Sequence, residues 1–165
     1  MKSQVKRSGG PGHGLAEEVF RLEPSERKQA AGHILVASED EPRRRRIAAA
    51  LSRDGHRVSE ARAPLELMKL AGITGPSLRH PTRPDAIVLD VTGKRWATLD
   101  MLEIVCTEHW TLPVLVLVDR SDGEAVAEAR RLGATAVLEL PIDEGAMRAE
   151  VMTIVEPSPP CRGAA

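Results

Sequence analysis

The residue with the clearest chemical potential is a carboxylate that ends a short apolar run. Residues 84–90 read Pro-Asp-Ala-Ile-Val-Leu-Asp, and turn residues follow them. Four consecutive apolar residues bounded in this way are typical of a strand that is buried on both faces. Asp90 then lies at the carboxyl end of the strand, where ligands bind in open α/β sheets. Asp90 is therefore the first candidate for chemistry.

A second group of carboxylates follows another apolar run. Residues 34–37 read Ile-Leu-Val-Ala, and Ser38, Glu39, Asp40 and Glu41 come next. The acids are equally suited to the first turn of a helix, where the helix dipole favours negative charge. A purely structural role stays open for them and for Asp90.

The elements that must position these acids are alternating strands and helices. The predicted strands are residues 34–37, 56–60, 84–90, 113–118 and 134–138, and the predicted helices are residues 47–54, 64–71, 97–108, 122–132 and 143–155. This alternation predicts a three-layer α/β/α sandwich, doubly wound around a parallel sheet. If the strand order is 2-1-3-4-5, the first and third strands meet at the switch point, and the two groups of carboxylates converge.

Composition bounds the organisation and the partners. The 165 residues and 42% hydrophobic content fit one domain, expected at 32–156, with a flexible arm at 1–31 and a disordered tail at 157–165. The net charge of −1 argues against a nucleic-acid partner, and no apolar run is long enough to span a membrane. Two cysteines and a start without a secretory signal lead us to expect a cytoplasmic protein.

Two further clusters have simple interpretations. Residues 43–46 are four consecutive arginines, which point in different directions on a helix, so we expect most to be solvated and Arg44 to pair with nearby acids. A nucleic-acid patch is the alternative, although no second basic element follows. Cys106 and His109 lie three residues apart on a predicted helix, but two ligands do not make a metal site.

Residues 33–156 resemble the receiver domain of bacterial response regulators. The resemblance rests on the order and spacing of residues 34–36, Gly55 and residues 84–90, 112–117, 133–134 and 138–142. It implies a five-stranded parallel sheet of order 2-1-3-4-5 in the flavodoxin-like class, and a signalling protein rather than an enzyme. An enzyme is also disfavoured, because the sequence offers no nucleophile together with a general base at plausible positions.

The resemblance also implies a chemistry for the carboxylates. In the family, an aspartate ending the third strand accepts a phosphoryl group from a histidine kinase, and acids after the first strand hold Mg²⁺. Asp90 matches the phosphoacceptor. Glu39 and Asp40, together with Asp90, are the candidate metal ligands.

Four other family positions depart from the pattern. Ser38 stands where one of the paired acids is expected, Val118 replaces the fourth-strand hydroxyl, Leu140 replaces the lysine, and Val137 replaces the fifth-strand aromatic. We therefore predict a pseudo-receiver that requires no cofactor and acts mainly through phosphorylation-independent protein–protein interaction. The alternative is a working single-domain response regulator, phosphorylated at Asp90 with Mg²⁺.

The expected partner is another signalling or scaffold protein, with a histidine kinase among the candidates and a homodimer left open. In this family the surface of the fourth helix, fifth strand and fifth helix commonly binds partners, which here implies residues 122–155. The candidate contact residues are Arg130, Arg131, Val137 and Glu139.

Overall fold

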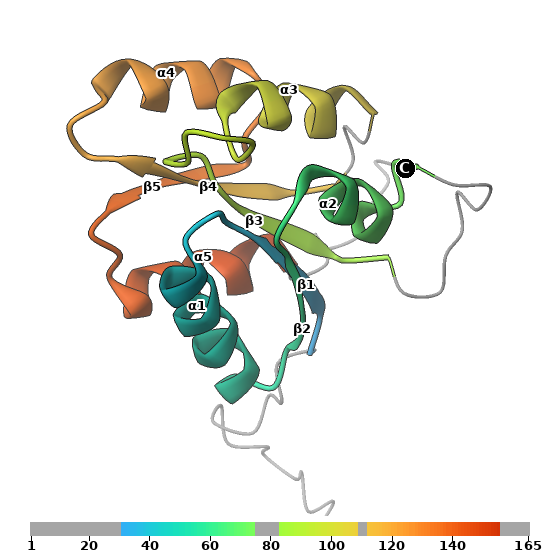
Figure 1. Cartoon of the computed structure of the whole chain (residues 1–165). Coiled ribbons are helices and arrows are strands. Elements are labelled where there is room, and N and C mark those ends of the chain that lie inside the picture. The colour runs from blue at the N-terminus through green and yellow to red at the C-terminus, as the bar shows by residue number, and fades with distance from the viewer. Residues whose placement is uncertain (1–30, 75–82, 109–111, 156–165) are drawn as a thin grey trace, which may run out of the picture.

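The fold is built around five parallel strands. A computed structural model describes residues 31–74, 83–108 and 112–155, which form one sheet of order β2-β1-β3-β4-β5 (Figure 1). The strands are β1 (His33–Ala37), β2 (Arg57–Ala61), β3 (Ala86–Asp90), β4 (Val114–Asp119) and β5 (Ala136–Leu140). The helices are α1 (Glu41–Arg53), α2 (Pro64–Ala71), α3 (Leu99–Glu108), α4 (Gly123–Arg131) and α5 (Glu144–Val155). The predicted fold class and strand order are confirmed.

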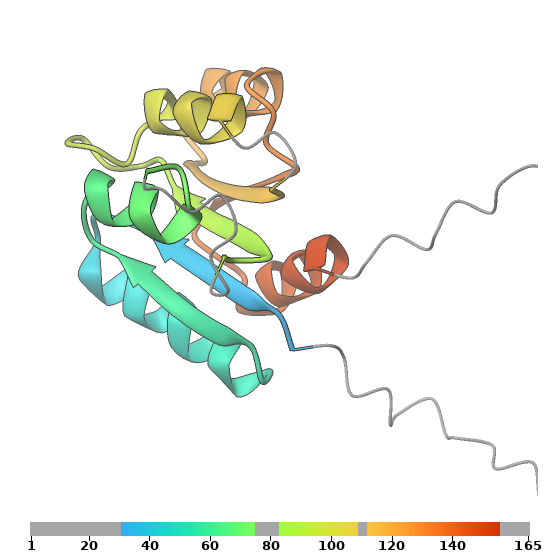
Figure 2. The same cartoon turned by 90° about the vertical axis from the view of Figure 1, so that its right-hand side faces the viewer.

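Helices cover both faces of the sheet. α1 and α5 lie against one face, while α2, α3 and α4 lie against the other (Figures 1 and 2). The apolar side chains divide into two aliphatic clusters in the same way, one under each layer of helices. β1 and β3 are buried along their whole length, as expected for central strands whose apolar runs do not alternate.

The register of the sheet brings the candidate residues to one edge. Ala37 of β1 pairs with Leu89 of β3, and Asp90 pairs with Leu117 of β4. Because the strands are parallel, the residues that follow β1 and β3 emerge side by side. Ser38 and Asp90 therefore meet at the carboxyl edge, as the switch-point argument predicts.

Most element boundaries differ from the predictions by one or two residues, and α1 begins at Glu41, six residues before the predicted start at 47. Two of the shifts have identifiable reasons. α3 begins at Leu99 instead of 97, because the first carbonyl to accept a helical hydrogen bond is that of Thr98, from the N–H of Leu102. β5 begins at Ala136 instead of 134, because the N–H of Ala134 bonds the carbonyl of Ala129 at the end of α4. Both shifts come from hydrogen bonds that apolar periodicity does not reveal.

Parts of the predicted organisation lie outside the described residues. These are the arm at 1–31, apart from residue 31, the tail at 157–165, and the middle of the connection between α2 and β3. Within the described segments, the helices are all too short or too polar to cross a membrane.

Candidate functional site

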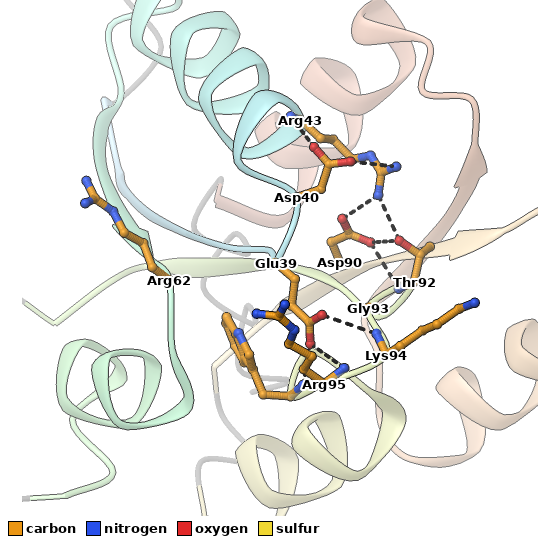
Figure 3. A pocket seen from close by; sticks show the side chains of 10 residues that line it. Glu39, Asp40, Arg43, Arg62, Asp90, Thr92, Gly93, Lys94 and Arg95 are labelled. Carbon is orange, nitrogen blue, oxygen red and sulfur yellow. Dashed lines mark hydrogen bonds and ion pairs between the residues drawn. The ribbon is translucent and has the colours of Figure 1, made fainter.

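The carboxylate of Asp90 is buried and bound on both oxygens. Its side chain is 2% exposed. Oδ2 accepts hydrogen bonds from Ser38 Oγ at 2.6 Å and from Arg43 Nη1 at 2.7 Å. Oδ1 accepts from the backbone N of Thr92 at 3.1 Å and from Thr92 Oγ1 at 2.6 Å. Figure 3 shows Asp90 enclosed between Arg43 and Thr92.

These donors determine the charge state of Asp90. Burial by itself raises the pKa of the carboxyl group, but the hydrogen bonds from Ser38, Thr92 and Arg43 outweigh it, so the pKa lies below its ordinary value. Asp90 is therefore ionised at neutral pH.

Arg43 supplies the positive charge beside Asp90. Asp40 caps the start of α1 by accepting the N–H of Arg43, which places Arg43 in the first helical turn. Side chains on a helix lean toward its N-terminus, here toward the strand ends. The guanidinium also donates to Thr92 Oγ1 at 2.8 Å and lies 3.4 Å from Asp40 Oδ2. Arg43 thus bridges Asp40 and Asp90, two of the three candidate metal ligands.

The third candidate ligand, Glu39, is bound elsewhere. Its carboxylate accepts four consecutive backbone N–H groups after β3, from Lys94 at 3.2 Å, Arg95 at 2.8 Å, Trp96, and Ala97 at 2.9 Å. Burial raises the pKa of Glu39, but these N–H groups outweigh it and the net shift is downward. Glu39 ties the loop after β1 to the loop after β3.

Gly93 permits this close approach. A Cβ at Gly93 would lie 2.6 Å from Cδ of Glu39 and 2.8 Å from its Oε1. No side chain larger than hydrogen fits without displacing the carboxylate.

The present arrangement does not form a Mg²⁺ site. In the described segments, no group of three or more His, Cys, Asp or Glu residues is placed to hold a metal ion. Asp40 and Asp90 hold a guanidinium, and Glu39 holds backbone N–H groups. Mg²⁺ requires free oxygen ligands in near-octahedral geometry, so Arg43 would have to leave before these residues could offer one.

The other family positions are apolar or otherwise engaged. Ser38 is fully buried and donates to Asp90. Val118 is fully buried in the core under α2, α3 and α4, and Val137 packs against the same cluster. Leu140 packs against the opposite cluster, under α1 and α5. None of the three apolar side chains offers a hydrogen-bond donor to Asp90.

A cleft of about 470 Å³ opens beside Asp90. It is lined by Glu39, Asp40, Arg43, Arg62, Asp90, Thr92, Gly93, Lys94, Arg95 and Trp96. The lining is dominated by charged side chains from the loops after β1, β2 and β3 (Figure 3). The cleft therefore suits a polar ligand better than an apolar one.

Sequence reasoning missed Arg43 and Thr92. It predicted that most of the four arginines at 43–46 are solvated, and this holds for Arg45 and Arg46, which are exposed. The predicted pairing of Arg44 is confirmed, because Nε lies 3.0 Å from Glu60 Oε2 and the side chain is 4% exposed. The signal that could have found Arg43 is its position in the first turn of the helix, three residues after the N-cap Asp40.

The remaining candidates lie apart from the cleft. Arg130, Arg131 and Glu139 are exposed around α4 and β5, where Arg131 pairs with Glu128 and Glu139 pairs with Arg120. Val137, in contrast, is half-buried against the core. Cys106 is half-buried and burial raises the pKa of its thiol, while His109 lies outside the described residues.

Solved structures similar to this chain include receiver domains of response regulators. The receiver domain of NtrX from Brucella abortus is 24% identical with a TM-score of 0.65, and the match covers 76% of this chain and 99% of that one. CheY4, a chemotaxis protein of Vibrio cholerae, is 20% identical with a TM-score of 0.63, over 76% of this chain and 99% of CheY4.

The longer NtrX chain from the same organism is 23% identical with a TM-score of 0.65; the match covers 76% of this chain but only 27% of that one. No protein-family model and no curated protein sequence matches the chain. The likeness therefore shows the receiver fold, and function must be argued from the site.

Proposed function

We propose that this protein is a receiver-like signalling module that acts without a phosphorylation switch, by binding another protein. The observation that carries the proposal is the ion pair between Arg43 and the buried carboxylate of Asp90, at 2.7 Å. A permanent cation of the chain takes the place that a receiver of this fold needs for Mg²⁺. In this interpretation Asp90 organises the loops around it and does not react.

The hydrogen bonds of Asp90 support this role. To accept a phosphoryl group, a carboxylate oxygen must present a free lone pair to the phosphorus atom. Here each oxygen accepts two donors, from Ser38, Arg43 and Thr92. Hydrogen bonds to a charged group contribute about 1.5–3 kcal/mol each, so opening the site is costly.

The positions expected to bind a phosphoryl group also lack suitable side chains. A phosphoryl group brings nearly two negative charges, and switching a two-state domain almost completely requires about 5.5 kcal/mol of differential binding. Val118 and Leu140, at the positions expected to contact the group, carry aliphatic side chains packed into the core. They cannot stabilise a phosphorylated state.

The second candidate function is a working phosphoacceptor with Mg²⁺. It is favoured by the position of an ionised Asp90 at the carboxyl end of β3, beside an open cleft. With acetyl phosphate as donor, an Asp90 oxygen would attack phosphorus, the phosphorus–oxygen bond to acetate would break, and an aspartyl phosphate would form as acetate leaves.

Intact-protein mass spectrometry separates the two functions. The full chain is incubated with Mg²⁺ and acetyl phosphate, with Asp90→Asn as the matched control. The proposal expects no phosphoryl adduct on the unmodified protein. A mass gain of one phosphoryl group that requires Mg²⁺ and is lost in Asp90→Asn would establish the second function instead.

The face formed by α4, β5 and α5 is the first candidate surface for a protein partner, such as a histidine kinase or a scaffold protein. Arg130 and Glu139 are exposed there and suit charge-reversal tests. Val137 is a poorer test, because its half-buried side chain also supports the core. Reversing Arg130 and Glu139 should abolish capture of an identified partner while thermal unfolding stays unchanged; retained capture would place the interface elsewhere.

A further inference from the structure

The cleft beside Asp90 contains three carboxylates whose charge is already satisfied within the chain. Asp90 is bound by Ser38, Thr92 and Arg43. Asp40 contacts the backbone N–H and the guanidinium of Arg43. Glu39 accepts four backbone N–H groups. The acidic side of the cleft is thus unavailable to an external cation.

The basic side of the cleft is largely free. Arg62, Lys94 and Arg95 line it and are exposed. Their side chains make no hydrogen bond or ion pair with residues 31–74, 83–108 or 112–155. With Arg43 included, the cleft is lined by four basic residues and by three acids, Glu39, Asp40 and Asp90, whose carboxylates already accept hydrogen bonds. This surface is therefore locally positive, although the whole chain has a net charge of −1.

The loops that carry these side chains are fixed in different ways. Arg62 follows β2, and its backbone N–H donates to Glu66 at the start of α2. Lys94 and Arg95 project from the loop after β3, whose backbone is held by Glu39. Trp96 follows them, half-buried against the core and lining the cleft. A partly exposed Trp among basic side chains is a common anchor in protein interfaces.

The spread of the basic side chains indicates the shape of the ligand. In Figure 3, Arg62 and Lys94 lie on opposite sides of the cleft and point away from each other, with Arg95 beside Glu39 between them. Basic side chains that diverge in this way do not converge on a single phosphate group. An extended chain with several carboxylates would contact each basic residue in turn.

We infer that Arg62, Lys94, Arg95 and Trp96, here called the basic rim, bind an extended acidic segment of a protein partner. The inference rests on the proposed function, because it assigns a class of partner to a module that acts by binding. It places a contact surface at the cleft, separate from the face of α4, β5 and α5. Attraction across an exposed surface of this kind weakens as salt is raised.

Fluorescence anisotropy with a defined probe tests the inference. The probe is a labelled peptide of about ten residues with alternating Glu and Ala, which spans roughly 35 Å when extended. The full chain is compared with a rim variant, Arg62→Gln, Lys94→Gln and Arg95→Gln. The matched control is Arg45→Gln, Arg57→Gln and Lys69→Gln, because these residues are also exposed and basic but belong neither to the cleft nor to the face of α4, β5 and α5.

The expected result is at least tenfold weaker binding in the rim variant and less than twofold in the control, with thermal unfolding unchanged in both. Equal weakening in the two variants would overturn the inference, because attraction would then be unspecific. So would weakening in the control alone, which would place the contact outside the cleft. Absence of binding, or displacement by inorganic pyrophosphate more readily than by unlabelled peptide, would also overturn it.

Two further samples keep this inference distinct from the proposed function. Asp90→Asn removes one negative charge from the cleft and should bind the peptide at least as tightly as the unmodified chain. In both proteins, Mg²⁺ with beryllofluoride should leave the affinity unchanged. If beryllofluoride alters the affinity of the unmodified chain but not of Asp90→Asn, the proposed function fails while the basic rim stands. If the peptide does not bind and Asp90 forms no adduct, only the inference fails.

Discussion

At the scale of single residues, the central feature is the guanidinium of Arg43 beside the buried carboxylate of Asp90. An arginine is always charged and presents several donors in a fixed plane, so it can neutralise a buried carboxylate without recruiting a ligand. Arg43 contacts Asp90, Thr92 and Asp40 at once. The charge of Asp90 is thereby balanced permanently, whereas a bound Mg²⁺ would depend on its concentration.

A double-mutant cycle measures this coupling. Arg43→Gln should lower the free energy of unfolding by about 1–3 kcal/mol, because it removes charged hydrogen bonds from a carboxylate that Ser38 and Thr92 still bind. With Asp90→Asn as the second mutation, the interaction energy should reach about 1–3 kcal/mol in urea unfolding. Additivity within about 0.3–0.5 kcal/mol would mean that the pair is not coupled.

The lowered pKa of Asp90 predicts how stability depends on pH. A carboxyl group whose pKa is lower in the folded state contributes stability above its unfolded pKa, about 3.9 for Asp, and loses it as pH falls through the folded pKa. The lowered value comes from Ser38, Thr92 and Arg43 acting against burial. Below about pH 4, the free energy of unfolding should therefore fall more steeply in the unmodified chain than in Asp90→Asn.

Urea titrations between neutral and acidic pH give the two slopes. Glu39 and Asp54 also have lowered pKa values and contribute equally to both proteins, so the difference reports Asp90. Identical acid slopes would show that Asp90 gains nothing from its donors in the folded state.

At the scale of elements, Glu39 determines how the loops after β1 and β3 meet. Four backbone N–H groups converge on one carboxylate, and Gly93 leaves room for it. The loop therefore keeps its shape without a ligand in the cleft.

Gly93→Ala tests this packing. The added methyl group would lie 2.6 Å from Cδ of Glu39, and overpacking of this kind costs about 1–3 kcal/mol. In a Glu39→Ala background, where the contact is absent, Gly93→Ala should lower the free energy of unfolding clearly less. Urea unfolding of the unmodified chain, the two single variants and the double variant gives the comparison. An equal cost in both backgrounds would show that Glu39 does not occupy the space over Gly93.

Amide hydrogen exchange gives an independent check on the same loop. In Glu39→Gln the N–H groups of Lys94 to Ala97 lose a charged acceptor, so their exchange should accelerate relative to that of β3. Asp54→Asn is the matched control, because the carboxylate of Asp54 also accepts hydrogen bonds, from Arg148, but lies at the far end of α1. Unchanged protection of residues 94–97 would contradict the role of Glu39.

At the scale of the whole molecule, the fold could be predicted and the site only in part. Apolar runs such as residues 34–37 and 86–89 predict buried strands. The alternation of such strands with helices predicts a doubly wound sheet. Asp90 could be located because its position follows from the strand. The partners of Arg43 and Glu39 could not, because they depend on side-chain directions across loops that are adjacent only after folding.

The resemblance to receivers implies a metal-binding role for the acids after β1. Sequence alone does not reveal that backbone N–H groups contact Glu39 and that a guanidinium contacts Asp40. The resemblance to receivers therefore predicted the architecture, whereas the three-dimensional contacts favour a domain whose acidic pocket is internally satisfied. Phosphorylation-independent action stays a proposal that experiment must decide.

The measurement that tests this account most directly is thermal unfolding with Mg²⁺ and beryllofluoride, an analogue of the phosphoryl group. Three proteins are compared: the unmodified chain, Asp90→Asn, and a variant with four substitutions. In that variant Ser38→Asp, Val118→Thr and Leu140→Lys restore expected family residues, and Arg43→Ala removes the guanidinium from Asp90. We predict no stabilisation of the unmodified chain or of Asp90→Asn, and a clear rise in Tm for the restored variant. Stabilisation of the unmodified chain that is lost in Asp90→Asn would contradict the account and identify a working receiver.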